Sequence, residues 1–175
     1  QGRHVIDQKN VEASVFYPPS GDVANGSAIF FSSTFAQPPV VVAQVDESLT
    51  DNGATSLRLI NTVGTSGFEV HLYSGSADGV SFVAMDPGEY TYGRYHWLAG
   101  VFDVNNACSP STSNCQFALP TGMFNNAVNG IFTVHDTNDS GSASYARARR
   151  LEPELVSLYL PGNTEFVHYI VWEEL

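Results

Sequence analysis

The sequence predicts an all-β protein with the architecture of an antiparallel β-sandwich. Turn-forming pairs such as Asn25-Gly26 and Pro161-Gly162 recur at short intervals along the chain. The runs between them are rich in β-branched and aromatic residues, and several alternate apolar with polar residues, which is the period of a half-buried strand. Because 175 residues can bury a core of their own, we expect one β-sandwich domain over residues 1–175.

Four runs in the first part of the chain have the composition of strands. Residues 11–17 combine valines with aromatic residues, and residues 29–35 begin with an aromatic run. Residues 40–45 start with consecutive valines, and residues 57–63 are mostly aliphatic. Each run ends near a turn signal, so each is expected to form a strand.

The next runs lie between residues 68 and 104. Residues 68–73 alternate most regularly, which places Phe68, Val70 and Leu72 on a core face and Glu69, His71 and Tyr73 on a polar face. Residues 80–85 are apolar except for Ser81. Residues 90–104 form an aromatic run, expected as one strand whose alternation gives one side to Tyr92, Arg94 and His96.

Three further runs, 131–135, 155–160 and 166–173, complete the predicted strands. The segment 145–155 has three arginines and two alanines that a helix would accept, but Pro153 interrupts it. We assign this segment to strand or loop. The chain is therefore expected to contain almost no helix.

The charge balance excludes some classes of partner. Seven basic residues oppose eighteen acidic ones, giving a net charge of -11. Such a surface repels phosphate backbones and anionic membranes, so nucleic acid is not expected as a partner. No apolar run reaches the ~20 residues of a membrane span, so membrane insertion is not expected either.

Cys108 and Cys115 are the only cysteines, separated by a short polar loop. We expect a local disulfide between them, although two free thiols are the alternative. Disulfides persist in oxidising compartments. The pair therefore favours a secreted, extracellular location or a virion surface.

Residues 29–99 contain an ordered set of short motifs: Phe31, Pro38-Pro39, Ser56-Leu57-Arg58, Thr65-Ser66-Gly67-Phe68 and Trp97-Leu98-Ala99. This set resembles H-type lectins, the family of snail agglutinins and of the C-terminal domain of discoidins. The resemblance implies an antiparallel β-sandwich core over 29–99, carbohydrate binding, and association into homo-oligomers, either trimers or hexamers. Residues 105–165, with the Cys108–Cys115 loop, would be an elaboration that adds C-terminal strands.

In the family, an arginine at the position of Arg58 donates to the sugar and an aspartate in the preceding loop, for which Asp22 is the nearest candidate, accepts from it. Arginine offers a fork of donors and a carboxylate accepts hydroxyl protons. The alternative for Arg58 is an ion pair with an acid such as Glu69. From the strand faces we add His71 as a polar contact, and Tyr73 and Tyr92 as stacking surfaces.

One departure from the family changes the expected specificity. Snail agglutinins have Trp-His directly after the strand matched by residues 68–73, where this chain has Gly75-Ser76. Their preference for N-acetylgalactosamine is therefore not expected here. We expect a glycan to be bound without being cleaved.

Two alternatives to a lectin remain open. A small secreted enzyme could degrade polysaccharides, either as a hydrolase with two carboxylates or as a lyase with a base and a neutralising arginine. A structural domain of a virion or fibre tip would use its polar strand faces for subunit contacts. The hydrolase pair would come from Glu69, Asp86, Glu89 and Asp103, and the lyase set from His71, Tyr92, Arg94 and His96 with Glu69.

The segment starting at Asp136 resembles the first half of a calcium loop. Asp136, Asn138 and Ser140 would supply oxygens, but the twelfth position is Arg147, where a glutamate is required. The five histidines show no metal-binding spacing in the sequence. A polar turn is favoured over a calcium site, and no cofactor is expected.

Overall fold

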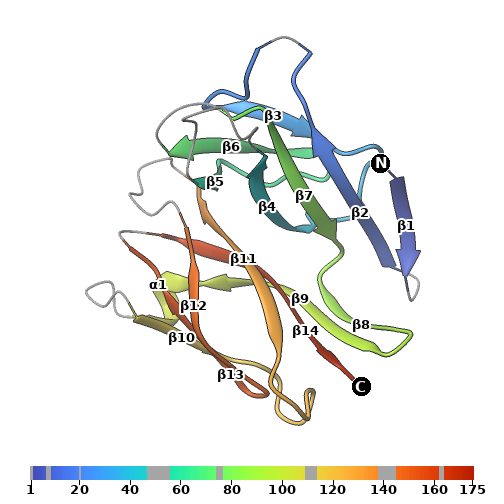
Figure 1. Ribbon diagram of the computed structural model, residues 1–175, viewed down its shortest axis with the longest axis vertical. Coiled ribbons are helices and arrows are strands. Elements are labelled where there is room, and N and C mark those ends of the chain that lie inside the picture. Colours follow the sequence, from blue (N-terminus) through green and yellow to red (C-terminus); the bar gives the residue numbers. More distant parts are fainter. Residues whose placement is uncertain are drawn as a thin grey trace.

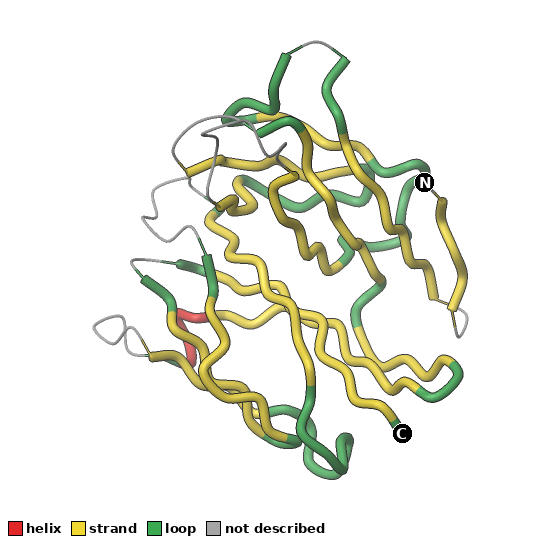
Figure 2. The backbone as a smooth tube through the Cα atoms, viewed as in Figure 1, coloured by secondary structure: helices red, strands yellow, loops and turns green. Residues whose placement is uncertain are grey.

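The computed structural model describes residues 2–6, 9–19, 21–46, 56–73, 77–108, 114–137, 145–161 and 164–175. It is nearly all β, with several sheets packed together, which confirms the predicted fold class (Figures 1 and 2). Among the described residues there is one helix, α1 (Val104–Ala107), which has four residues. No helix of the described residues is long and apolar enough to cross a membrane. Asn138 and Ser140 of the calcium hypothesis, and the Gly75-Ser76 departure, lie outside the described residues.

The described strands form three sheets. All pairs are antiparallel except β5 with β11. The four-stranded sheet contains, in spatial order, β1 (Gly2–Ile6), β2 (Lys9–Phe16), β7 (Gly79–Met85) and β4 (Val40–Asp46). The seven-stranded sheet contains β3 (Ser27–Phe30), β6 (Gly67–Tyr73), β5 (Ser56–Ile60), β11 (Asn129–Asp136), β14 (Phe166–Glu174), β9 (Tyr95–Asp103) and β8 (Gly88–Tyr92). The three-stranded sheet contains β10 (Asn114–Ala118), β13 (Leu155–Tyr159) and β12 (Arg147–Glu152).

The seven-stranded sheet is the central layer and runs through both halves of the molecule (Figure 1). One of its faces packs on the four-stranded sheet, where Phe68 of β6 lies 5.2 Å from Phe82 of β7 between ring centroids. The opposite face, over β9, β14 and β11, is covered by the three-stranded sheet, where Phe102 stacks on Phe117 at 4.5 Å. The central sheet therefore supports a core on each side.

The four-stranded sheet buries side chains on both of its faces. Val41 faces the first core with Phe82, whereas Val42 faces a further cluster with Tyr90 and Ile170 of the central sheet. The free edge of β4 lies against the face of β11 and β14 that carries Thr133 and His168.

Side chains from the central sheet cap the edge of β4. The Thr133 hydroxyl accepts from the Ala43 amide at 2.8 Å and donates to the Ala43 carbonyl at 3.2 Å. His168 Nδ1 accepts from the Val41 amide at 3.0 Å. These bonds satisfy groups that would otherwise be open to strand addition.

The bond to His168 continues into a buried relay. Because Val41 donates to Nδ1, the neutral ring carries its proton on Nε2 and donates to His135 Nδ1, 3.2 Å away. His135 then donates from Nε2 to the Asn61 carbonyl at 2.7 Å. Burial lowers the pKa of His168 to about 3 and also lowers the pKa of His135, so both rings are neutral near pH 7.

The main correction to the predicted strands concerns residues 90–104. They form two strands, β8 and β9, joined by a turn in which Gly93 has φ 61°, and the run ends in α1, which Asp103 caps through its side chain. The strands β1 and β10 were not predicted. Segment 145–155 contains β12, as the assignment to strand or loop allowed.

The elaboration predicted for 105–165 is divided between two sheets. Its strands β10, β12 and β13 form the three-stranded sheet, whereas β11 joins the central sheet between β5 and β14. The predicted disulfide between Cys108 and Cys115 is present. It connects the end of α1 to β10.

Candidate functional site

The polar face predicted for residues 68–73 is confirmed. Phe68, Val70 and Leu72 are buried in the core, and Glu69, His71 and Tyr73 are partly or fully exposed. Arg58 of β5 pairs directly with His71, and Ser56 pairs with Tyr73. The outer face of β5 and β6 therefore brings together Arg58, Glu69, His71 and Tyr73.

Arg58 is not displayed on this face as a sugar donor should be. It is only 6% exposed, whereas Tyr73 is 53% exposed. Glu69, the expected ion-pair partner of Arg58, accepts a bond from Asn61 Nδ2 at 2.5 Å. The partly or fully exposed polar groups of this face are therefore Glu69, His71 and Tyr73.

The other two predicted sugar contacts lie elsewhere. Asp22 is exposed in the segment before β3, and β6 separates β3 from the strand of Arg58. Tyr92 is 66% exposed at the end of β8, at the opposite edge of the central sheet from β3. The five predicted residues do not form one site.

The predicted lyase set is also divided. The turn at Gly93 pairs Tyr92 with Tyr95 and Thr91 with His96, so Tyr92 and His96 face opposite sides, contrary to the expectation. Arg94 and His96 each contact a carboxylate: Arg94 Nε lies 2.9 Å from Glu174, and His96 Nε2 lies 2.7 Å from Glu89. His71 is several strands away on β6.

The carboxylates proposed for hydrolysis hold local structure. Asp86 accepts from the backbone and side-chain amides of Asn10 at 2.8 and 3.0 Å. Asp103 caps α1. Since Glu69 and Glu89 lie near opposite edges of the central sheet, these four residues are not assembled as a catalytic pair.

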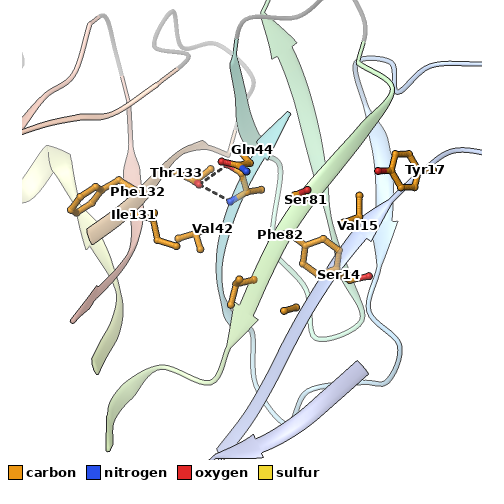
Figure 3. A pocket seen from close by; sticks show the side chains of 13 residues that line it. Ser14, Val15, Tyr17, Val42, Gln44, Ser81, Phe82, Ile131, Phe132 and Thr133 are labelled. Atoms are coloured by element: carbon orange, nitrogen blue, oxygen red, sulfur yellow. Dashed lines mark hydrogen bonds between the residues drawn. The ribbon is translucent and has the colours of Figure 1, made fainter. Parts of the chain in front are cut away.

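A groove that the sequence did not indicate lies between the four-stranded sheet and β11 (Figure 3). Its volume is about 800 Å³, within the ~300–1,000 Å³ typical of ligand pockets. Valines and the 42%-exposed Ile131 provide apolar surface. The described lining consists of Ala13, Ser14, Val15, Tyr17, Val42, Ala43, Gln44, Ser81, Phe82, Val83, Ile131, Phe132 and Thr133.

The polar groups of the groove are uncharged. Gln44 and Ser81 are cross-strand partners on β4 and β7, and they are labelled at the groove in Figure 3. The Tyr17 hydroxyl donates to Asp46 at 2.7 Å, and this bond raises the pKa of Tyr17. The groove thus combines aliphatic surface with hydroxyl and amide groups. Sequence reasoning missed it because β11 is distant in the chain from β4.

Among the described residues, no group of three or more His, Cys, Asp or Glu side chains is arranged to hold a metal ion. Asp136, the first residue of the calcium hypothesis, is buried on β11. Comparisons with protein-family models, curated proteins and solved structures find no match to this chain.

Proposed function

We propose that the chain is an extracellular carbohydrate-binding domain that holds a neutral glycan in the groove without cleaving it. The observation that carries the proposal is the composition of the groove, in which aliphatic side chains lie beside uncharged donors and acceptors and no described lining residue is charged. A sugar ring presents C–H surfaces and hydroxyl edges, so it needs both kinds of contact.

Each polar group of the groove suits a hydroxyl-rich ligand. The Gln44 amide both donates and accepts, and the Ser81 hydroxyl does the same. The Tyr17 hydroxyl donates to Asp46, which leaves its oxygen as an acceptor for a sugar hydroxyl. Gln44 and Ser81 lie on two paired strands of one sheet, and Tyr17 directly follows β2 of the same sheet. The strand pairing positions these groups before a ligand arrives.

The resemblance of residues 29–99 to H-type lectins supports the same class of function and makes the outer face of β5 and β6 a second candidate site. There, exposed Tyr73 and half-buried His71 would contact the sugar, and buried Arg58 would support the strands. The disulfide agrees with an oxidising, extracellular compartment. A trimer or hexamer would strengthen weak single sites through multivalency.

A glycan array followed by analysis of the bound glycans tests the proposal. We expect retention of a neutral glycan with no new chain ends, and at least tenfold weaker binding by Gln44→Ala. Tyr17→Phe should weaken binding less, because it removes one hydroxyl. Tyr73→Ala, on the other face, is the matched control and should bind as the parent does.

The other outcomes point to the alternatives. Loss of binding in Tyr73→Ala with retention in Gln44→Ala assigns the site to β5 and β6. New chain ends indicate a polysaccharide-degrading enzyme. Failure to retain any glycan favours a structural domain of a virion or fibre tip.

A further inference from the structure

Basic residues are concentrated on one strand of this acidic protein. Of the seven lysine and arginine residues in the chain, Arg147, Arg149 and Arg150 lie on β12. We propose that the outer face of the three-stranded sheet, the face that carries these arginines, binds glycans bearing carboxylate or sulfate groups. This site is separate from the groove and does not depend on it.

A β-bulge brings the three arginines to the same face. Strict alternation would place Arg147 and Arg150 on opposite sides of β12. The pairing of β12 with β13 shifts between Ala148 and Arg150, so that Arg147 pairs with Tyr159 and Arg150 with Ser157. Since Tyr159 and Ser157 are two positions apart on β13, both arginines face one side.

Arg149 joins the same face through an aromatic contact. Its guanidinium lies 5.0 Å from the centroid of the Tyr159 ring, a cation–π arrangement that restricts the side chain. The opposite side of β13 carries Val156 and Leu158, which are buried against the central sheet. The arginine face is therefore the outer one.

The arginines are available to a ligand. All three are exposed. Arg150 is paired with Glu152, whose oxygen lies 2.5 Å from Nη2. Within the described part of the chain, Arg147 and Arg149 make no ion pair with a carboxylate. The guanidinium groups of Arg147 and Arg149 can thus each donate two hydrogen bonds to an external anion.

Neutral amides lie across the same face. Asn114 and Gln116 of β10 are the cross-strand neighbours of Tyr159 and Ser157, and both are exposed. An acidic sugar unit carries an anionic group together with hydroxyls, which matches guanidinium beside amide.

A nucleic acid fits this face less well. The net charge of -11 opposes every long polyanion, charged glycans included, so base stacking is what separates the two ligands. Single-stranded nucleic acids need exposed aromatic surfaces for base stacking, and the Tyr159 ring is already in contact with Arg149. A charged glycan has no bases to stack and needs only the guanidinium and amide groups of this face.

Binding to soluble alginate, a polyuronate, and to dextran sulfate tests the proposal, with neutral dextran as the control polymer. We expect the parent to bind at least one charged polymer, with affinity that falls as salt is added. Arg147→Gln and Arg149→Gln should each weaken this binding about fivefold. Arg94→Gln is the matched control: it removes the same charge from an exposed arginine at the β8–β9 turn, and should bind as the parent does.

Circular dichroism and thermal unfolding establish that each variant is folded. Gln44→Ala should leave binding of the charged polymers unchanged, which separates this site from the groove. The proposal is overturned if the β12 variants bind like Arg94→Gln, if neither charged polymer binds, or if a single-stranded oligonucleotide binds more tightly than both. It is also overturned if Arg147→Gln changes only the self-association of the chain, because the occupant would then be a second copy.

Discussion

Acidification should destabilise this protein through the buried histidine relay. In the folded state the pKa of His168 is lowered to about 3, first by burial and then by neighbouring His135, whereas an unfolded chain has an ordinary histidine pKa of about 6.5. Below pH 6.5 the unfolded state therefore binds a proton at this histidine, whereas the folded state does not. The contribution of neutral His168 to the free energy of unfolding is present above pH 6.5 and is lost as the pH falls below it.

The size of the effect follows from the pKa difference. Each pH unit below 6.5 costs about 1.4 kcal/mol for one such group, so lowering the pH from 7 to 5 should reduce the free energy of unfolding by about 2 kcal/mol through His168 alone. His135 adds to the loss, since burial also lowers its pKa against weaker opposing effects of Asn61, Glu165 and Asp136.

Urea unfolding at pH 7 and pH 5 measures this loss. The stacked Trp97 and Trp172 rings, with centroids 5.5 Å apart, provide a fluorescence signal. In His168→Gln, the amide oxygen can accept from the Val41 amide and the amide nitrogen can donate to His135, but the side chain does not titrate. Between the two pH values the free energy of unfolding of the variant should therefore fall by about 2 kcal/mol less than that of the parent. Equal losses in parent and variant would refute the reasoning, whatever the stability of the variant at pH 7.

Three other substitutions probe the fold. Gly67→Ala should cost about 2 kcal/mol in thermal unfolding, because its Cβ would lie 2.3 Å from the Ile29 carbonyl oxygen. Gly64→Ala, whose nearest neighbour lies at 3.5 Å, should lose less stability. Equal losses in the two variants would contradict the close approach of β3 and β6. Thr133→Val should cost about 1–3 kcal/mol in urea unfolding by leaving the Ala43 amide unsatisfied, with exposed Thr91→Val as a control that should change little. Replacing both cysteines by serine should lower the free energy of unfolding by about 2.5 kcal/mol, because the open chain gains entropy when unfolded. Reduction of the parent should reproduce that loss. An unchanged unfolding midpoint after reduction would show that the bridge contributes no stability.

Local patterns in the sequence were sufficient for most of the strands. The alternation in residues 68–73 identified which side chains of β6 are buried, because a half-covered strand carries that information in its own residues. The short polar loop between the cysteines likewise indicated their disulfide. Both inferences concern residues close together in the chain.

The errors and omissions concern positions where a single residue or a distant strand decides the outcome. Gly93 converts one predicted strand into a hairpin and reverses the face of Tyr92 relative to His96. The bulge at Arg149 has a similar effect on the arginines of β12. The groove requires β11 to lie beside β4, and no alternation within either strand specifies that contact.

The capped edge of β4 also has a consequence for the order of events during synthesis. Thr133 and His168 lie 90 and 127 residues after the backbone groups that they satisfy. On the ribosome, β4 therefore emerges with an unprotected edge, and strands that follow much later must arrive before it is covered. Contacts of such large sequence separation form slowly. During that interval the first half of the chain is a target for strand-to-strand aggregation, and chaperone binding to nascent chains of this protein should persist until β14 has emerged.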